Sequence, residues 1–152
     1  IFFGEVLWVG IKGAVMAFGV TLVLCCFGLF DNMINLPLIL LVGFFVAIPC
    51  GALGLIATAL VNNINQFQTV YSFLIAPLYF LSGIFYPLSQ MNSVMKFFIS
   101  FFPLVHGVRM SQAVFWNKDI ITTFLFHGPI LVLQSLVLCF LAYVLIKRKL
   151  IN

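Results

Sequence analysis

Long apolar runs without charged residues dominate the pattern of this chain. They cover residues 13–30, 32–95 and 120–146. A helix needs about 20 mostly apolar residues to cross a membrane, so the chain has room for about four spans. The runs are continuous, whereas the strands of a membrane barrel alternate apolar and polar residues over about 10 positions. The pattern therefore predicts helices that span a membrane.

We predict an all-α integral membrane protein that forms a single transmembrane domain over residues 1–152. The predicted spans cover residues 13–30, 36–61, 69–86 and 120–146. Pro49, inside the second span, predicts a kink there because proline removes a backbone donor. Amide side chains after the second span are expensive in hydrocarbon and predict a short loop. These amides belong to Asn62, Asn63, Asn65, Gln66 and Gln68.

Two segments carry too much charge to be read as spans. Residues 1–12 have Glu5 and Lys12 near their ends, which favours an interfacial helix leading into the first span. Residues 88–119 are interrupted by three basic residues and broken in the middle by Pro103. We expect this second segment to be a re-entrant pair of short helices that enters and leaves the membrane on one side.

The composition excludes a soluble domain. Hydrophobic residues make up 64% of the chain and charged residues only 7%, with a mean hydropathy of +1.27. Soluble domains have about 25% charged residues, and so few charges cannot cover a water-facing surface. The chain begins at Ile1 and nothing in it is typical of a signal peptide, which leaves a fragment of a longer protein as one reading.

The formal net charge is +4, and the one cluster of basic residues follows the last predicted span. It consists of Lys147, Arg148 and Lys149. Such a cluster usually marks the cytoplasmic side, so we predict a cytoplasmic C-terminus. Residues 88–119 then lie on the opposite side. A broad basic face is absent, and we expect no nucleic-acid partner.

The sequence does not predict a catalytic, cofactor or metal site. The cysteines lie inside apolar runs without a C-x-x-C pair, which is typical of packing residues. No G-x-x-x-x-G-K-[ST] phosphate loop occurs around Lys12, so the chain cannot bind ATP by that route. Serine, histidine and acidic residues are too scattered to indicate a catalytic triad. An intramembrane protease or transferase is a minor alternative.

Several polar residues keep two interpretations open. Glu5 is either a docking residue or an interfacial charge that reaches water. His106 and Arg109 have either a functional role, in which they line a polar path or bind lipid headgroups, or a structural role as an anchor at the membrane interface. His127 is either a hydrogen-bonded packing residue, which we favour, or a proton relay.

Three stretches, in this order, resemble the permease subunit of type-2 ABC transporters, the group that includes nodulation lipo-oligosaccharide and antibiotic-resistance exporters. The first is Gly4-Glu5 followed by Lys12-Gly13 at the head of an apolar run. The second runs from Leu81 to Gln90 and reads LSGIFYPLSQ, similar to the family's S-G-x-x-[FY]-P block. The third runs from Phe102 to Arg109 and reads FPLVHGVR, similar to a P-[LV]-x-H-x-x-x-x-R stretch with a shorter gap before the arginine.

The resemblance implies a dimeric permease, made of two copies, that is driven by a separate cytoplasmic ABC ATPase. The ATP and Mg would be bound by that partner, with no cofactor in this chain. The implied cargo is a lipid-linked glycan, a lipo-oligosaccharide or a hydrophobic drug. Family members usually have six spans, and this chain resembles the third to the sixth.

The resemblance also implies roles for particular residues. Gly4 and Glu5 would couple the chain to the ATPase. The re-entrant segment on the far side would shape the exit through Gly83, Phe85, Tyr86, Pro87, Pro103, His106 and Arg109.

Two readings compete with the permease. One is a structural or assembly subunit, or a permease remnant, whose helices pack without transporting anything. The other is a channel or proton-coupled carrier, which would usually place ionisable groups inside its spans. Here only His127 comes close to that description.

Overall fold

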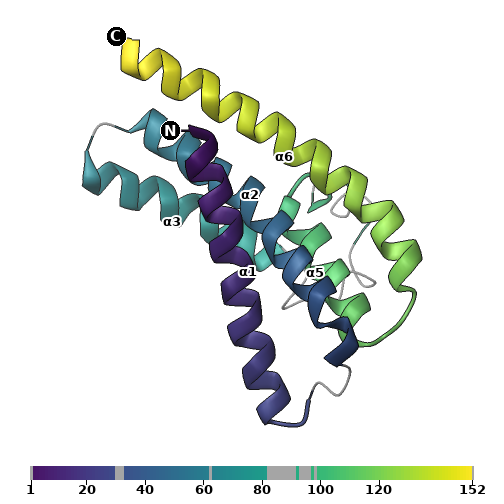
Figure 1. The fold of residues 1–152 in the computed structure, drawn as a ribbon. Coiled ribbons are helices and arrows are strands. Elements are labelled where there is room, and N and C mark those ends of the chain that lie inside the picture. Colours follow the sequence, from purple (N-terminus) through teal and green to yellow (C-terminus); the bar gives the residue numbers. More distant parts are fainter. Residues whose placement is uncertain are drawn as a thin grey trace.

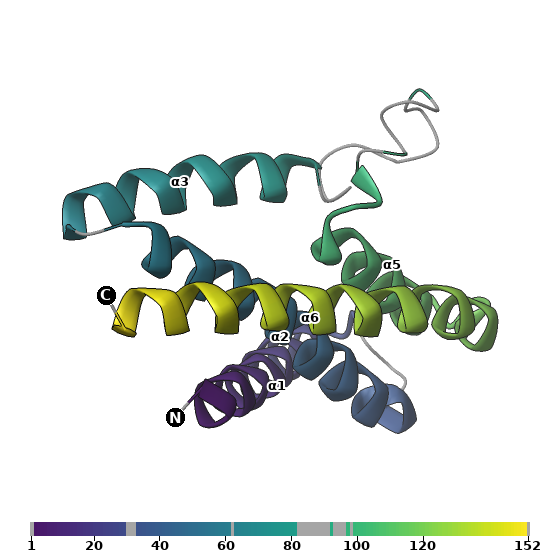
Figure 2. The same ribbon diagram turned by 90° about the horizontal axis from the view of Figure 1, so that it is seen from above.

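The computed structural model describes residues 2–29, 33–61, 63–81, 92, 97 and 99–151. The elements in these residues are α1 (Phe2–Cys26), a 3-10 turn η1 (Met33–Asn35), α2 (Leu36–Leu60), α3 (Ile64–Leu81), α5 (Pro103–Phe115) and α6 (Ile120–Ile151). The all-α class is therefore confirmed for this part of the chain. Helix α2 lies in the middle and packs against α1, α5 and α6 (Figure 1). Helices α1 and α3 lie on opposite sides of it (Figure 2).

The two ends of the bundle differ in what they contain. At one end the ring of Phe2, at the start of α1, packs edge-on against Tyr143 near the end of α6, with centroids 5.6 Å apart. Helix α2 ends and α3 begins at this same end, which we name the basic end because Lys147, Arg148 and Lys149 lie there. At the other end, Asn35 before α2 donates a hydrogen bond to Asn117 after α5, at 3.3 Å. We name it the α5 end.

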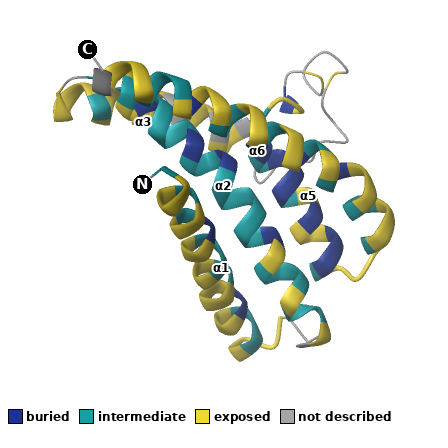
Figure 3. Cartoon of the chain, turned by 45° about the horizontal axis from the view of Figure 1, so that its top comes forward, coloured by how far each residue is buried: buried dark blue, intermediate teal, exposed yellow. Residues whose placement is uncertain are grey.

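Three helices of the described chain, α1, α2 and α6, are long and apolar enough to cross a membrane. Most of the surface of α1 and one side of α6 are exposed (Figure 3). Large apolar side chains such as Phe3, Met16 and Ile121 are among the exposed residues, as expected for helices that face lipid. Helix α3 does not meet the same criteria, so the prediction of four spans is not confirmed.

Helix α1 corrects the division expected at Lys12. One continuous helix runs from Phe2 to Cys26, in place of an interfacial helix over residues 1–12 followed by a span over 13–30. The charge of Lys12 does not interrupt it, because the ammonium group lies over the ring of Trp8, 5.2 Å from its centroid. The helix also stops before residue 30. Gly28 has a φ of +66°, and Leu29 N–H and Gly28 N–H donate to Leu24 O and Cys25 O, closing the helix as a Schellman motif.

Small residues bring α1 and α2 into close contact. A side chain at Gly13 would collide with Ala47 and with the backbone oxygen of Gly43, 2.5 Å from the position of the added carbon. From the opposite helix, Gly43 is equally closely approached by Ala17. Backbones that approach this closely gain van der Waals contact, which drives helix association where the surroundings are apolar.

Helix α3 begins earlier than expected, and α2 matches its prediction closely. The structure ends α2 at Leu60, one residue before the predicted boundary, and continues it through Pro49. It starts α3 at Ile64, so Asn65 and Gln68 lie on the first turns of a helix and were wrongly assigned to a loop. Both side chains are exposed there, and a helix can carry amides on a face that is not buried in the bundle.

The break at Pro103 is confirmed within the described residues. Turn residues Ser100 to Phe102 precede α5, and Pro103 occupies the first position of that helix, where its missing N–H has no consequence. At 13 residues, α5 is too short to cross a membrane. It would form the second arm of the predicted re-entrant pair. Most of the first arm lies outside the described residues, so the pair as a whole remains a prediction.

The connection from α5 to α6 is tight, and α6 is longer than expected. Asn117 and Asp119 adopt φ values of 50° and 48°, in the left-handed region that Asn and Asp tolerate better than other residues with side chains. Helix α6 begins at Ile120 as predicted but continues past residue 146 to Ile151. The basic cluster prolongs the helix because Lys and Arg are good helix formers and their charge favours a helix C-terminus.

Candidate functional site

A buried pair of histidines joins α5 to α6. His106 is 3% exposed and His127 is 9% exposed. Their Nδ1 atoms are 2.8 Å apart, within hydrogen-bonding distance, and the ring centroids are 5.0 Å apart. Val105 and Gly107, the neighbours of His106 along α5, are also buried, and the ring of Phe126 packs edge-on against His127 with centroids 5.3 Å apart. The pair is thus a polar link inside an apolar contact between two helices.

The hydrogen bonds of His106 define which nitrogens carry protons. Its Nε2 atom lies 2.9 Å from the carbonyl oxygen of Ser100, which can only accept, so Nε2–H is the donor. In a neutral ring the other nitrogen, Nδ1, then accepts, and His127 Nδ1–H donates to it. These hydrogen bonds are all satisfied when both histidines are neutral.

Gln134 supports the backbone turn that precedes α5. Its amide nitrogen donates to the carbonyl oxygens of Ser100 at 3.0 Å and Phe101 at 3.4 Å. Gln134 is about 21 Å along α6 from Ile120 at 1.5 Å per residue, deep within the length of the helix. Non-helical carbonyls at such a depth require partners from the protein. Gln134 and His106 supply them, and Gln134 Oε1 is buried with no hydrogen-bond partner among the described residues.

Arg109 lies one turn after His106 on α5 and is exposed. Burial lowers the pKa of His106 below its ordinary value near 6.5, the charge of Arg109 lowers it further, and the hydrogen bond to Ser100 acts in the opposite direction. The surroundings of His106 therefore favour its neutral form, which is the form that can accept a hydrogen bond from His127.

The basic end brings together residues from three helices. Gly4 and Glu5 are exposed on the first turn of α1, and a carbon added at Gly4 would meet no other described part of the chain within 4 Å. Lys149 of α6 donates to the carbonyl oxygens of Thr58, at 2.9 Å, and of Val61. These are carbonyls at the end of α2 that have no partner within the helix, so Lys149 caps α2 and ties it to α6.

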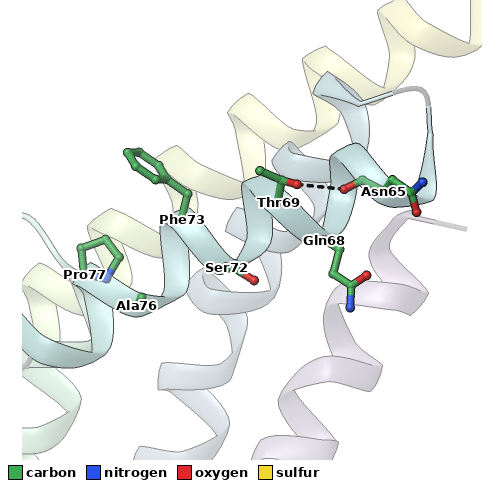
Figure 4. A pocket seen from close by; sticks show the side chains of 7 residues that line it. All are labelled: Asn65, Gln68, Thr69, Ser72, Phe73, Ala76 and Pro77. Atoms are coloured by element: carbon green, nitrogen blue, oxygen red, sulfur yellow. Dashed lines mark hydrogen bonds between the residues drawn. The ribbon is translucent and has the colours of Figure 1, made fainter.

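An open groove of about 910 Å³ runs along α3. Amides and hydroxyls line the half nearer the basic end, and apolar residues line the other half. The polar residues are Asn65, Gln68, Thr69 and Ser72, and the apolar residues are Phe73, Ala76 and Pro77 (Figure 4). Thr69 Oγ1 donates to the backbone oxygen of Asn65 at 3.1 Å, as Figure 4 shows. Gln68 and Ser72 extend to the same side of α3 (Figure 4).

The residues proposed from the sequence fall into separate places. Pro103, His106 and Arg109 lie together on α5, whereas Gly4 and Glu5 lie at the basic end. Gly83, Phe85, Tyr86 and Pro87 lie outside the described residues, so their place is not tested. Within the described ranges, no group of three or more potential metal ligands is found.

Nothing in the order of residues predicts that His106 pairs with His127 or that Gln134 binds the turn before α5. The sequence predicts that His127 is a hydrogen-bonded packing residue, but it does not predict which residue His127 binds. Histidine and glutamine side chains are rare in apolar segments, and that rarity is the signal that could have singled out these residues. The chain has only two histidines, and Gln134 is the one amide side chain between Ile120 and Ile151.

Comparison with known proteins places the chain among membrane transport proteins. The family model described as "ABC-2 type transporter" matches residues 1–116. Nodulation protein J from Rhizobium leguminosarum bv. trifolii is 27% identical over 152 residues, covering 98% of this chain and 56% of the relative. Nodulation protein J from Rhizobium meliloti (strain 1021) is 26% identical over 150 residues, covering 97% of this chain and 55% of the relative. The chain thus spans about half the length of these curated relatives. None of the solved structures matches it.

Proposed function

Because the chain belongs to the ABC-2 type transporter family of membrane proteins, we propose that it forms part of a permease that exports an amphiphilic molecule with energy from a separate cytoplasmic ATPase. In this proposal two copies of the permease enclose the path, and the membrane is the bacterial inner membrane. The chain itself carries out no chemical reaction. ATP and Mg are bound by the partner.

The observation that carries this proposal is the groove on α3. Its amides and hydroxyls are exposed in an otherwise apolar chain. Uncovered amides facing hydrocarbon are unfavourable by several kcal/mol, on the order of 2–7 each, so this face requires either water, cargo or another chain. A wall of a translocation path meets that requirement. A purely structural subunit would be expected to cover such a face with its own helices.

The order of residues along the groove favours one class of cargo. Uncharged donors and acceptors at Asn65, Gln68 and Ser72 suit the hydroxyl groups of a sugar, and they are followed by Phe73, Ala76 and Pro77, which suit an acyl or isoprenyl chain. Among the expected cargoes, a lipid-linked glycan or lipo-oligosaccharide matches this division better than a wholly apolar drug.

The basic end is the proposed ATPase contact. Glu5 is exposed on the first turn of α1, and the neighbouring Gly4 leaves the backbone accessible. A carboxylate in this position can accept hydrogen bonds from Arg or Lys of a soluble partner. A charge-assisted bond of this kind contributes about 1.5–3 kcal/mol.

The test is transport by the full-length permease and its ATPase in lipid vesicles, with a fluorescent lipid-linked oligosaccharide as cargo. Gln68→Leu should raise the half-saturating cargo concentration about two- to tenfold, the loss of one hydrogen bond, while Gln68→Asn retains most of the activity. Glu5→Gln should lower cargo-stimulated ATP hydrolysis about tenfold without changing membrane insertion. Wild-type transport in Gln68→Leu would contradict the proposed path. Wild-type ATP hydrolysis in Glu5→Gln would leave Glu5 as an ordinary interfacial charge.

A further inference from the structure

We propose that the hydrogen-bonded pair of His106 and His127 is an acid-sensitive joint, which holds α5 against α6 while both rings are neutral and lets the helices separate when protons enter the pair. The pair bridges two helices that otherwise meet through apolar side chains. It also adjoins the turn at Ser100, where α5 is attached to the preceding chain.

The hydrogen bonds leave no favourable place for an added proton. In the neutral pair, His106 Nε2–H is directed to Ser100 and His127 Nδ1–H is directed to His106. A first added proton must go to His127 Nε2, which keeps the link but creates a charge in a buried position. A second added proton, on His106 Nδ1, would direct two N–H groups at each other and remove the link.

Among the residues that the structure describes, no acidic side chain pairs with either histidine to compensate the added charge. Arg109, one turn away on α5, is itself positive. From α2 the packing residues are the apolar Val42, Phe45 and Val46, and from α6 the ring of Phe126 packs edge-on against His127. Glu5 lies at the opposite end of the bundle, and Asp119 lies before the first turn of α6, with no ion pair to either histidine among the described residues.

The direction of the pH dependence follows from these charges. A histidine released from the pair can take up a proton without losing a hydrogen bond, as unperturbed histidine does near pH 6.5, whereas the closed pair resists a buried charge. The separated state therefore binds more protons, and acid favours it. The pair favours closure most strongly above about pH 6.5, and below that pH the ratio of separated to closed molecules rises by up to about tenfold per pH unit for each proton taken up.

The experiment measures the distance between α5 and α6 directly. Spin labels are placed on Gln112→Cys and Leu133→Cys, both exposed positions, in the full-length permease with its native cysteines replaced by alanine. The labelled protein is diluted with unlabelled protein in lipid vesicles, so that distances within one copy dominate. Distance distributions are recorded by pulsed electron resonance at pH 7.5 and 5.5. Wild type should show one short distance at pH 7.5 and an added longer one at pH 5.5.

Two substitutions at the same position distinguish the joint from a general effect of acid. In His127→Asn the amide can turn to offer N–H or oxygen to His106, so the link persists when His106 takes up a proton, and acid should produce far less of the longer distance than in wild type. In His127→Leu the partner is lost, so the longer distance should be present at both. A wild-type distribution that does not change with pH, or a His127→Asn variant that opens in acid as wild type does, would overturn the proposal.

Discussion

At the scale of the residue, the same amino-acid type has different consequences at different places on α1. A carbon added at Gly13 would collide with Ala47 and Gly43 of α2, while nothing lies within 4 Å of the corresponding position at Gly19. The sequence places both glycines in the same apolar run and does not show which of them contacts another helix. The distinction depends on which face of α1 turns toward α2.

Gly13→Ala should therefore destabilise the protein and Gly19→Ala should not. The first change forces two backbones apart, and overpacking of this kind typically costs about 1–3 kcal/mol. The second replaces an exposed glycine with a better helix former, which changes stability by about 1 kcal/mol or less in the favourable direction. Thermal unfolding of both variants of the full-length permease in detergent micelles provides the measurement. Equal melting temperatures would contradict the close packing of α1 on α2.

At the scale of the element, the sequence predicted helix positions well where apolar runs and prolines coincide. Helix α2, the start of α5 at Pro103 and the start of α6 at Ile120 were all placed to within one residue. The errors concern polar groups inside helices. Lys12 does not end α1, because its ammonium group lies over the ring of Trp8. Asn65 does not prevent the formation of α3, because its side chain is exposed. A sequence shows that a polar group is present but not which partner it finds in the fold.

Gln134 offers a test of how one helix holds another in place. Gln134→Leu removes the amide that binds the carbonyls of Ser100 and Phe101, so the turn before α5 should open more often. A hydrogen bond between membrane helices contributes about 0.6 kcal/mol on average and a typical protein hydrogen bond about 1 kcal/mol, which corresponds to about three- to fivefold faster opening.

Hydrogen–deuterium exchange in peptides that cover residues 99–107 reports this opening. Leu133→Ala, on an exposed position of α6, serves as the control and should leave exchange in these peptides unchanged. Exchange that is equally slow in wild type and in Gln134→Leu would mean that the turn is held by other contacts.

At the scale of the whole molecule, the two ends of the bundle carry different elements and side chains. Glu5, the polar half of the α3 groove and the basic cluster lie at the basic end, whereas the last turn of α5 and the first turn of α6 lie at the α5 end. The resemblance noted from three short stretches agrees with the family match over residues 1–116. It could not reveal the His106–His127 link, which joins residues from two different elements.

The most direct test is to find which side of the membrane each end faces. Single cysteines replace the exposed Lys118 at the α5 end and the exposed Arg148 at the basic end, in a full-length permease without other cysteines. Intact cells and inverted membrane vesicles are then treated with a membrane-impermeant maleimide. Because α1, α2 and α6 are each long enough to cross the membrane, Lys118→Cys should be labelled only in intact cells and Arg148→Cys only in inverted vesicles. Labelling of both positions from the same side would contradict the account.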